Sequence, residues 1–369
     1  MITYKYKLYQ TDKNKHLDKM LREAAFVWNH ALAIQKRYYR LYGKYISKFT
    51  MQKHFSKRIN RNLLHSQTTQ EIIERLDMSY NRFFKKIAKR PPKFKKAAHF
   101  SSFLFKQGGY KLYGNEFVIN KISKKYKFHK SREIEGNIKT IRVCRVKSGQ
   151  YYLIIVTDAT SKPYYKSHNG AAIGIDFGMK TYLTLSDNST YKSPLFFKQY
   201  QSELKTANRR VSRAKKGSNN RKKRLFELNQ IHDNITNKRS DYQWKLAHEL
   251  CRNFDYIMIE DLCMKGMQRR WGKKISDLSH ASFVEKLQYV ATKYNVVVHK
   301  IDRFYPSSKT CGCGEINKSL TLKDRVWTCP TCGCSNERDL LASRNILRRG
   351  IYELESIDKT DFSALYACI

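Results

Sequence analysis

Five of the nine cysteines of this 369-residue chain fall within residues 310–334. Four of them form two close pairs, with the pattern C-x-C followed by C-x2-C, and a fifth thiol, Cys334, comes soon after the second pair. Four thiolates can hold one Zn²⁺ tetrahedrally and leave no position for water, so such a site is structural. We therefore expect a zinc-binding insertion over residues 306–335 that is too small to have its own core. The expected ligands are Cys311, Cys313, Cys329 and Cys332, and Cys334 is an extra thiol that could replace one of them.

Positive charge is the strongest signal in the composition. The chain has 73 Lys and Arg against 31 Asp and Glu, which gives a net charge of +42 at pH 7. Such an excess favours an anionic partner, and nucleic acid fits because each neutralised phosphate releases counterions. The charge is densest in residues 85–96, with seven basic residues in twelve, and in residues 198–224, with eleven Lys or Arg and one acid. We expect both segments to contact phosphates.

The sequence does not favour a membrane protein or a secreted one. No segment approaches the about 18 apolar residues that a membrane-spanning helix requires. The first ten residues, MITYKYKLYQ, have no apolar signal region. We therefore expect a cytoplasmic protein with no membrane partner, in a reducing compartment where disulfides are not expected.

Hydrophobic periodicity divides the rest of the chain. Residues 1–10 alternate as in a strand, and a period of 3.6 residues predicts helices from Thr11 and from about Thr68. Thr68 and Glu71 have the spacing of a helix-capping box. Short alternating segments in residues 97–165 predict a β-rich module. The basic segment predicts two helices that meet near residues 217–220.

Three acidic residues stand where predicted elements end or begin. Asp176 ends the first strand of AAIGIDFGMKTYLTLSD, and Glu260 ends the strand in FDYIMIEDL. Asn336 is a candidate N-cap that places Asp339 in the first turn of the last helix. Each acid alone is explained by a turn, a cap or the helix dipole. Together they can converge on one edge of a mixed sheet.

Three converging carboxylates in so basic a chain need cations between them. Oxygen ligands and a phosphate substrate favour Mg²⁺. Two such ions about 3.5–4 Å apart can activate water on one side and stabilise the leaving oxygen on the other. The predicted chemistry is hydrolysis of a phosphodiester backbone.

GIDFG, IEDL, FYPSSKTC with the paired cysteines, and ERDLLASRNIL follow one another in this order. With them, nearly the whole chain resembles the TnpB family of IS200/IS605-type transposon-encoded RNA-guided nucleases, which are related to type V CRISPR effectors. The resemblance implies an α+β multidomain protein: a RuvC/RNase H-like mixed-sheet nuclease core with a zinc-ribbon insertion, a helical recognition lobe and a β-rich wedge module. The implied ranges are 1–10 for the first wedge strand, 11–96 for the recognition lobe, 97–168 for the wedge, 169–305 for the core with a basic helical insertion at 196–250, 306–335 for the zinc insertion, 336–350 for the last core helix and 351–369 for a tail.

The resemblance also implies an activity. A guide RNA from the transposon end pairs with one strand of double-stranded target DNA, with one protein per guide RNA, and the protein recognises a short flanking DNA motif. Asp176, Glu260 and Asp339 match the family's catalytic carboxylates and would hold two Mg²⁺ ions. The helix start at residues 65–71 is a candidate reader of the flanking motif, and Arg338 is a candidate contact for the scissile phosphate. The implied location is the prokaryotic cytoplasm, in association with the nucleoid.

The chain departs from the family pattern at two places. The first cysteine pair is C-x-C where C-x2-C is common, and Leu341 and Ala342 stand where the family often has an Asn after the last acid. Two other classes of function also fit the residues. A DDE-type transposase or integrase uses the same sheet and metals for strand transfer, and a basic zinc-ribbon protein binds nucleic acid without catalysis.

Overall fold

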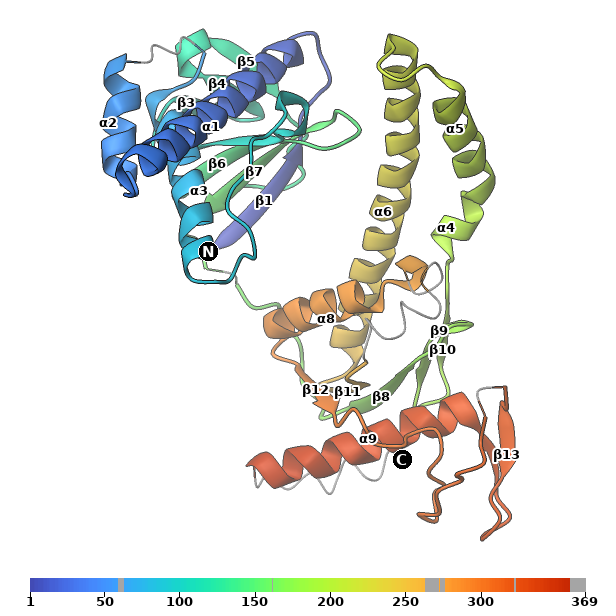
Figure 1. The fold of residues 1–369 in the computed structure, drawn as a ribbon. Coiled ribbons are helices and arrows are strands. Elements are labelled where there is room, and N and C mark those ends of the chain that lie inside the picture. The colour runs from blue at the N-terminus through green and yellow to red at the C-terminus, as the bar shows by residue number, and fades with distance from the viewer. Residues whose placement is uncertain (59–62, 161, 263–271, 273–275, 322, 359–369) are drawn as a thin grey trace. The chain divides into compact units, whose positions relative to one another are not determined.

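The chain forms two compact units, Met1–Ser161 and Lys162–Ile369 (Figure 1). The computed structural model describes residues 1–58, 63–160, 162–262, 272, 276–321 and 323–358. Within these ranges, no helix has the length and apolar character needed to cross a bilayer.

The first unit packs helices against antiparallel sheets around one apolar core (Figure 1). Its main sheet has the order β1-β7-β6-β2, and a smaller sheet has the order β3-β4-β5. Alternate side chains of β7, such as Leu153 and Ile155, are buried, as the sequence pattern predicts for a sheet with one covered face. The bounds are β1 (Ile2–Lys7), α1 (Asn14–Tyr42), α2 (Lys48–Arg58), α3 (Ser66–Phe84), β2 (Ser102–Phe105), β3 (Tyr110–Tyr113), β4 (Glu116–Ile119), β5 (Lys124–Lys127), β6 (Ile138–Arg145) and β7 (Tyr151–Thr157).

The start of α3 differs from the capping-box prediction. The N-cap is His65, whose Nδ1 accepts a hydrogen bond from the Gln67 backbone N–H at 3.3 Å. Thr68 is fully buried inside the helix, and Glu71 is paired with Arg75 at 2.6 Å. The capping-box prediction was wrong. Thr68 is packed in the interior, and Glu71 forms its ion pair with Arg75 of the same helix, so neither side chain caps the start of α3.

The second unit contains a five-stranded mixed sheet of order β10-β9-β8-β11-β12 (Figure 1). The β10–β9 and β9–β8 pairs are antiparallel, whereas β8–β11 and β11–β12 are parallel. The strand–turn–strand predicted in residues 171–187 and the strand predicted in residues 254–262 are confirmed. The bounds are β8 (Ala172–Phe177), β9 (Thr181–Leu185), β10 (Thr190–Lys192), β11 (Tyr256–Glu260) and β12 (Val297–Ile301).

Helices cover both faces of this sheet. One face, with Ile173 and Ile257, packs against α6 (Asn219–Asn253) and α8 (His280–Tyr294). The other face, with Met258, packs against α9 (Arg338–Asp358). The predicted end of the last helix at residue 350 falls inside α9, which continues to Asp358, and residues 359–369 of the expected tail lie outside the described residues.

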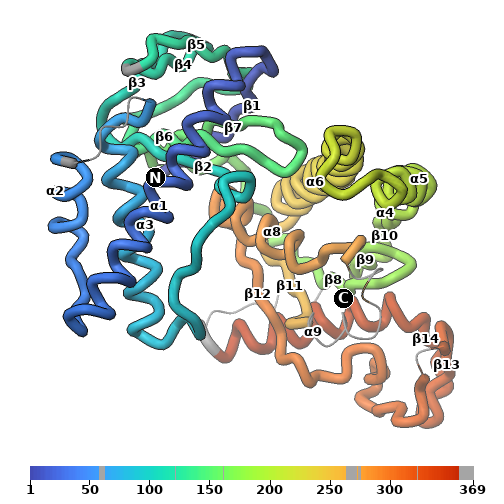
Figure 2. Tube along the Cα trace, turned by 45° about the horizontal axis from the view of Figure 1, so that its top comes forward, coloured from blue at the N-terminus to red at the C-terminus, as the bar shows by residue number. Residues whose placement is uncertain are grey.

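The basic segment forms two helices that meet near residues 217–220, as predicted, and the two helices lie antiparallel. The short helix α4 (Phe196–Gln199) leads into α5 (Gln201–Arg213), which runs beside α6 in both views (Figure 1, Figure 2). Ser218 is the N-cap of α6, and its Oγ accepts a hydrogen bond from the Arg221 N–H at 3.1 Å.

Two glycines let α9 lie directly on the sheet. A Cβ atom at Gly174 of β8 would lie 2.1 Å from the Ser343 carbonyl oxygen, and one at Gly350 would lie 2.7 Å from the Met258 sulfur. Neither position has room for a side chain. This close approach fixes the start of α9 relative to the ends of β8 and β11.

Candidate metal centres

The two predicted strand-end acids lie level with each other on one face of the sheet. Ile175 of β8 is opposite Ile259 of β11, so Asp176 and Glu260, which follow them, are at the same height. Side chains alternate across a strand, so both acids belong to the face that α9 covers. Asp339 lies in the first turn of α9, as predicted.

The electrostatics link the three carboxylates. Burial and the negative charges of Glu260 and Asp339 raise the pKa of Asp176 to about 8, against the opposing charge of Arg338. Burial also raises the pKa of Glu260, although a hydrogen bond from the Ser307 hydroxyl opposes that shift. A buried carboxyl whose pKa is raised by two neighbouring carboxylates favours a bound cation, because a positive charge stabilises its ionised form.

Two of the three acids have a side-chain partner among the described residues. Arg325 Nη1 donates to both oxygens of Asp339, and Ser307 donates to Glu260. In the part of the chain that is described, the cysteine cluster is the one group of three or more Cys, His, Asp or Glu side chains whose ligand atoms all lie within 4.8 Å of one another. The three carboxylates do not form such a group in this structure.

Asn345 is a residue of this region that the sequence prediction missed. It lies on α9, is 2% exposed, and donates through Nδ2 to the carbonyl oxygens of Ser307 at 2.8 Å and Thr310 at 2.6 Å. These bonds join the loop that contacts Glu260 to the helix that carries Asp339. The sequence feature that could have identified Asn345 is its position beside Ile346, where a polar residue interrupts the apolar face of an amphipathic helix.

Of two other residues singled out in the sequence, Asn336 has a different role from the one expected, and Arg338 is held by the cysteine-containing module. Asn336 is in the strand β14 (Ser335–Glu337) and donates to the Cys334 carbonyl oxygen at 3.2 Å, so it is not the N-cap of α9. Arg338 Nη1 donates to the Thr321 carbonyl oxygen at 3.0 Å. The side chain of Arg338 is thus engaged with the backbone of the cysteine-containing module, while its charge still acts on Asp176.

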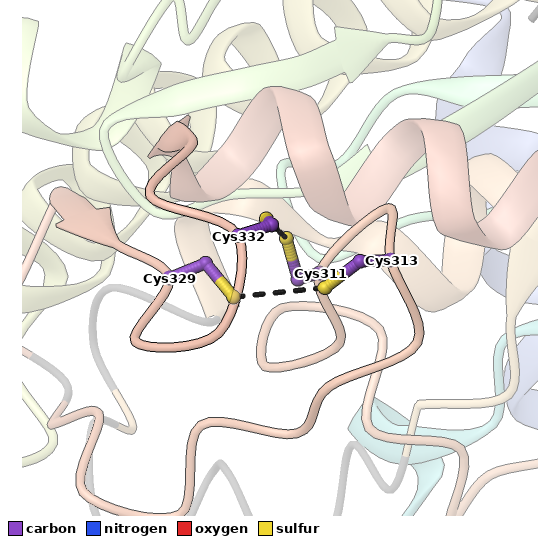
Figure 3. A group of neighbouring side chains, drawn as sticks. All are labelled: Cys311, Cys313, Cys329 and Cys332. Carbon is purple, nitrogen blue, oxygen red and sulfur yellow. Dashed lines mark hydrogen bonds between the residues drawn. The ribbon is translucent and has the colours of Figure 1, made fainter.

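The four predicted zinc ligands come together (Figure 3). The Sγ atoms of Cys311 and Cys332 are 3.6 Å apart, and those of Cys313 and Cys329 are 3.7 Å apart. A tetrahedral site with Zn–S bonds of about 2.3 Å has sulfur–sulfur distances of about 3.8 Å. The cluster therefore fits one Zn²⁺, and the exposed Cys334 is outside it.

The backbone around the cluster supports thiolates and shapes two tight turns. A hydrogen bond from the Cys313 backbone lowers the pKa of the Cys311 thiol to about 6. The Gly314 N–H donates to Cys311 O at 3.0 Å, and the Gly333 N–H donates to Cys329 O at 3.0 Å. These turns aim the paired thiols at a common point.

The cysteine module leads directly into the carboxylate region. Its two short strands, β13 (Val326–Thr328) and β14 (Ser335–Glu337), pair as an antiparallel hairpin beside the start of α9 (Figure 2). Arg325 immediately precedes β13, and β14 ends at the residue before α9. A metal that fixes this hairpin therefore also fixes Arg325 and Asp339.

The basic run at residues 85–96 is held against α1 in the first unit. Asn29 accepts from the Lys95 N–H and donates to the Lys95 carbonyl oxygen, both at 2.8 Å. The Lys95 ammonium lies 3.6 Å from the centre of the Trp28 ring. Phe94, in the same run, is 55% exposed. Lys95, near the end of this run, is therefore fixed against α1.

Family comparisons agree on one group of proteins. The model of the OrfB_IS605 family, described as "Probable transposase", matches residues 155–270. A "Cas12f1-like, TNB domain" model matches residues 280–346, and the helix-turn-helix model of OrfB_IS605 proteins matches residues 1–44.

Full-length relatives and one solved structure extend the agreement. A Streptomyces pristinaespiralis protein named "Putative RNA-guided DNA endonuclease" is 28% identical, over 94% of this chain and 89% of its own. "Putative RNA-guided DNA endonuclease InsQ" of Escherichia coli (strain K12) is 27% identical, over 88% and 86%. The Cas12f1 chain in a cryo-EM structure of a Cas12f1–sgRNA–target DNA complex superposes with a TM-score of 0.55 at 15% identity, over 91% of this chain and 83% of that chain, and so shares the fold.

Proposed function

Because the chain belongs to the TnpB/OrfB family of IS605-type elements, we propose that it is an RNA-guided DNA endonuclease. Its proposed partners are one guide RNA from the transposon end and a double-stranded DNA target with a short flanking motif. The family relatives that carry this name align with this chain over most of both lengths. The net charge of +42 supports a partner with many phosphates.

The observation that carries the proposal is the placement of Asp176 and Glu260 side by side on the sheet face that α9 covers, with Asp339 in the first turn of that helix. We assign these three carboxylates as the catalytic site. The sheet order β10-β9-β8-β11-β12, antiparallel in one half and parallel in the other, supports a RuvC/RNase H-like core. The first unit would then contain the recognition lobe and the wedge, and residues 306–335 the zinc insertion.

The carboxylates would hold two Mg²⁺ ions, which supply water activation and stabilisation of the leaving oxygen. The raised pKa of Asp176 supports this fit, because ionising that carboxyl beside two others is unfavourable without a cation. Ser307 orients Glu260 through its hydrogen bond, and Asn345 holds Ser307 in place. Arg325 and Arg338 add positive charge where a scissile phosphate would arrive.

The test starts from protein expressed at its native locus, with the bound RNA recovered and sequenced. The complex is then given a plasmid that carries the RNA-matched target beside a randomised flank, with Mg²⁺ or EDTA. We expect double-strand cuts that need the RNA and Mg²⁺ and that disappear in Asp176→Asn. Cutting by Asp176→Asn would refute the site assignment.

Other outcomes would support the two alternative functions. Strands joined to new ends, without bound RNA, would indicate the transposase chemistry. Tight, salt-sensitive DNA binding that never leads to cutting, even with RNA and Mg²⁺, would indicate a binding protein without catalysis.

A further inference from the structure

The loop between β12 and the cysteine module is attached to Glu260 at both ends. Ile301, the last residue of β12, is opposite Glu260 in the parallel pair with β11. Ser307, six residues later, donates its hydroxyl hydrogen bond to the Glu260 carboxylate. Residues 302–306 therefore form the rim of the carboxylate region.

This rim is held by many contacts. The Phe304 N–H donates to Asp302 Oδ1 at 3.1 Å, and the Ser307 N–H donates to the Tyr305 carbonyl oxygen at 2.8 Å. Arg303 Nε donates to the Asp261 carbonyl oxygen at 3.0 Å, and its Nη2 forms an ion pair with the Asp261 carboxylate. Asp261, the acid that the carboxylate site does not use, thus fixes the loop to the end of β11.

Two adjacent aromatic residues in the loop have opposite environments. Tyr305 packs against the apolar cluster under α9, with the Arg349 guanidinium 5.6 Å from its ring centre. Phe304 is 87% exposed. The contacts of the loop hold this exposed ring where a ligand that reaches the carboxylate region can stack on it.

We propose that Phe304 is a positioning residue that stacks on a nucleobase of the DNA strand entering the carboxylate site. This inference rests on the proposed function. A nucleobase is the partner that the surroundings favour, because the ring lies on the rim of a phosphodiester-cleaving site in a strongly basic chain. Aromatic side chains stack on any base of an unpaired strand, which suits an enzyme whose guide, and not its protein, reads the sequence.

The function of this contact would be to hold the strand in register. Carboxylates and their cations act on a phosphate that must be placed accurately. A base stacked on Phe304 fixes the nucleotide next to the rim, and the Arg303–Asp261 pair keeps the ring from moving with the strand. Loss of the ring should slow cutting and leave guide loading unchanged.

The test compares the wild-type RNA complex with Phe304→Ala and Phe304→Trp on one target duplex, with abasic nucleotides placed singly near the cut in either strand. We expect Phe304→Ala to cut about tenfold more slowly and Phe304→Trp to cut at nearly the wild-type rate. At one position, an abasic nucleotide should slow cutting by the wild type about tenfold, as the Phe304→Ala substitution does. The same abasic nucleotide should not slow cutting by Phe304→Ala any further. Tyr352→Ala is the matched control, since Tyr352 is 57% exposed in the same unit, on α9 far from Asp339.

A second readout does not depend on cutting. The Asp176→Asn complex is bound to DNA with 2-aminopurine at the position found by the abasic scan, or at each position in turn. We expect Phe304 to quench its fluorescence and Phe304→Ala to restore it. No quenching at any position overturns the inference even if the protein does not cut, and absence of cutting by the wild type is a failure of the proposed function alone.

Three further results would overturn the inference. The first is a wild-type cutting rate in Phe304→Ala. The second is an abasic effect of the same size in the wild type and in Phe304→Ala, because independent effects mean that the ring and the base do not interact. The third is a change of oligomeric state in Phe304→Ala, which would show that the ring is covered by a second copy of the chain.

Discussion

Arg325 Nη1 donates a hydrogen bond to each carboxylate oxygen of Asp339, at 3.1 Å to Oδ1 and 2.9 Å to Oδ2. The arginine comes from the start of the cysteine hairpin and the acid from the first turn of α9. A cation that binds Asp339 competes with this arginine for the carboxylate oxygens. The pair therefore couples divalent-ion binding to the position of the hairpin.

Substituting this arginine should strengthen binding of the divalent ion in the absence of nucleic acid. The two side chains are 47% and 26% exposed, and pairs of this kind contribute about 0–1 kcal/mol. We expect Arg325→Ala to bind Mn²⁺, as a substitute for Mg²⁺, up to about fivefold more tightly in a paramagnetic-resonance titration. Arg325→Lys, which keeps the charge, should change the affinity less. Equal or weaker Mn²⁺ binding by Arg325→Ala would show that Arg325 and the ion do not compete.

The raised pKa of Asp176 predicts how the stability of the metal-free protein depends on pH. The ordinary pKa of this carboxyl is 3.8, and burial with the charges of Glu260 and Asp339 raises it to about 8. Between these values the folded protein holds a proton that the unfolded chain has released, so the free energy of unfolding falls as pH rises through that window. Asp176→Asn should remove this part of the slope in urea titrations at several pH values in EDTA.

The control for this experiment is Asp241→Asn, which changes an exposed carboxylate on α6. It should keep the wild-type slope. If Asp176→Asn and the wild type lose stability in parallel between pH 4 and pH 8, the carboxylates are not coupled in the free protein.

The sequence predicted the parts of this protein that depend on local patterns. Alternation and turn residues placed the strands that end at Asp176 and Glu260, and close cysteine pairs identified the four thiols that cluster. Such signals work because strand periodicity and metal-ligand spacing are properties of a few neighbouring residues.

The contacts around those residues could not be predicted in the same way. The partnership of Asn345 with Ser307, the ion pair of Arg303 with Asp261 and the exposure of Phe304 all depend on chain segments that only the fold brings together. Asn336 is an example. Its position in the sequence suits a helix N-cap, but in the structure it lies in the hairpin strand β14 and its side chain donates to the Cys334 carbonyl oxygen. Tertiary pairing decides between two locally acceptable roles.

Close packing of α9 on β8 predicts that Gly174 tolerates no side chain. The Cβ of alanine would lie 2.1 Å from the Ser343 carbonyl oxygen and 2.7 Å from the Leu347 nitrogen, and both are backbone atoms that cannot turn away. We expect Gly174→Ala to lower the free energy of unfolding by about 1–3 kcal/mol in urea titrations. Gly108→Ala is the control, since its nearest neighbour would be 4.0 Å away. Equal stability of the two variants would mean that α9 can shift outward freely.

Because the cysteine hairpin leads directly into α9, we expect loss of zinc to abolish cutting even though all three carboxylates remain in the chain. Cys329 is buried in the four-thiol cluster, and Cys334 is exposed outside it. Cys329→Ser should therefore lose zinc in metal analysis, become sensitive to protease within residues 311–334, and lose RNA-guided cutting, because the released hairpin no longer fixes the start of α9. Cys334→Ser should keep its zinc and its activity. If Cys329→Ser loses zinc and still cuts at the wild-type rate, the metal stabilises only the hairpin, and the packing of α9 on Gly174 is enough to position Asp339.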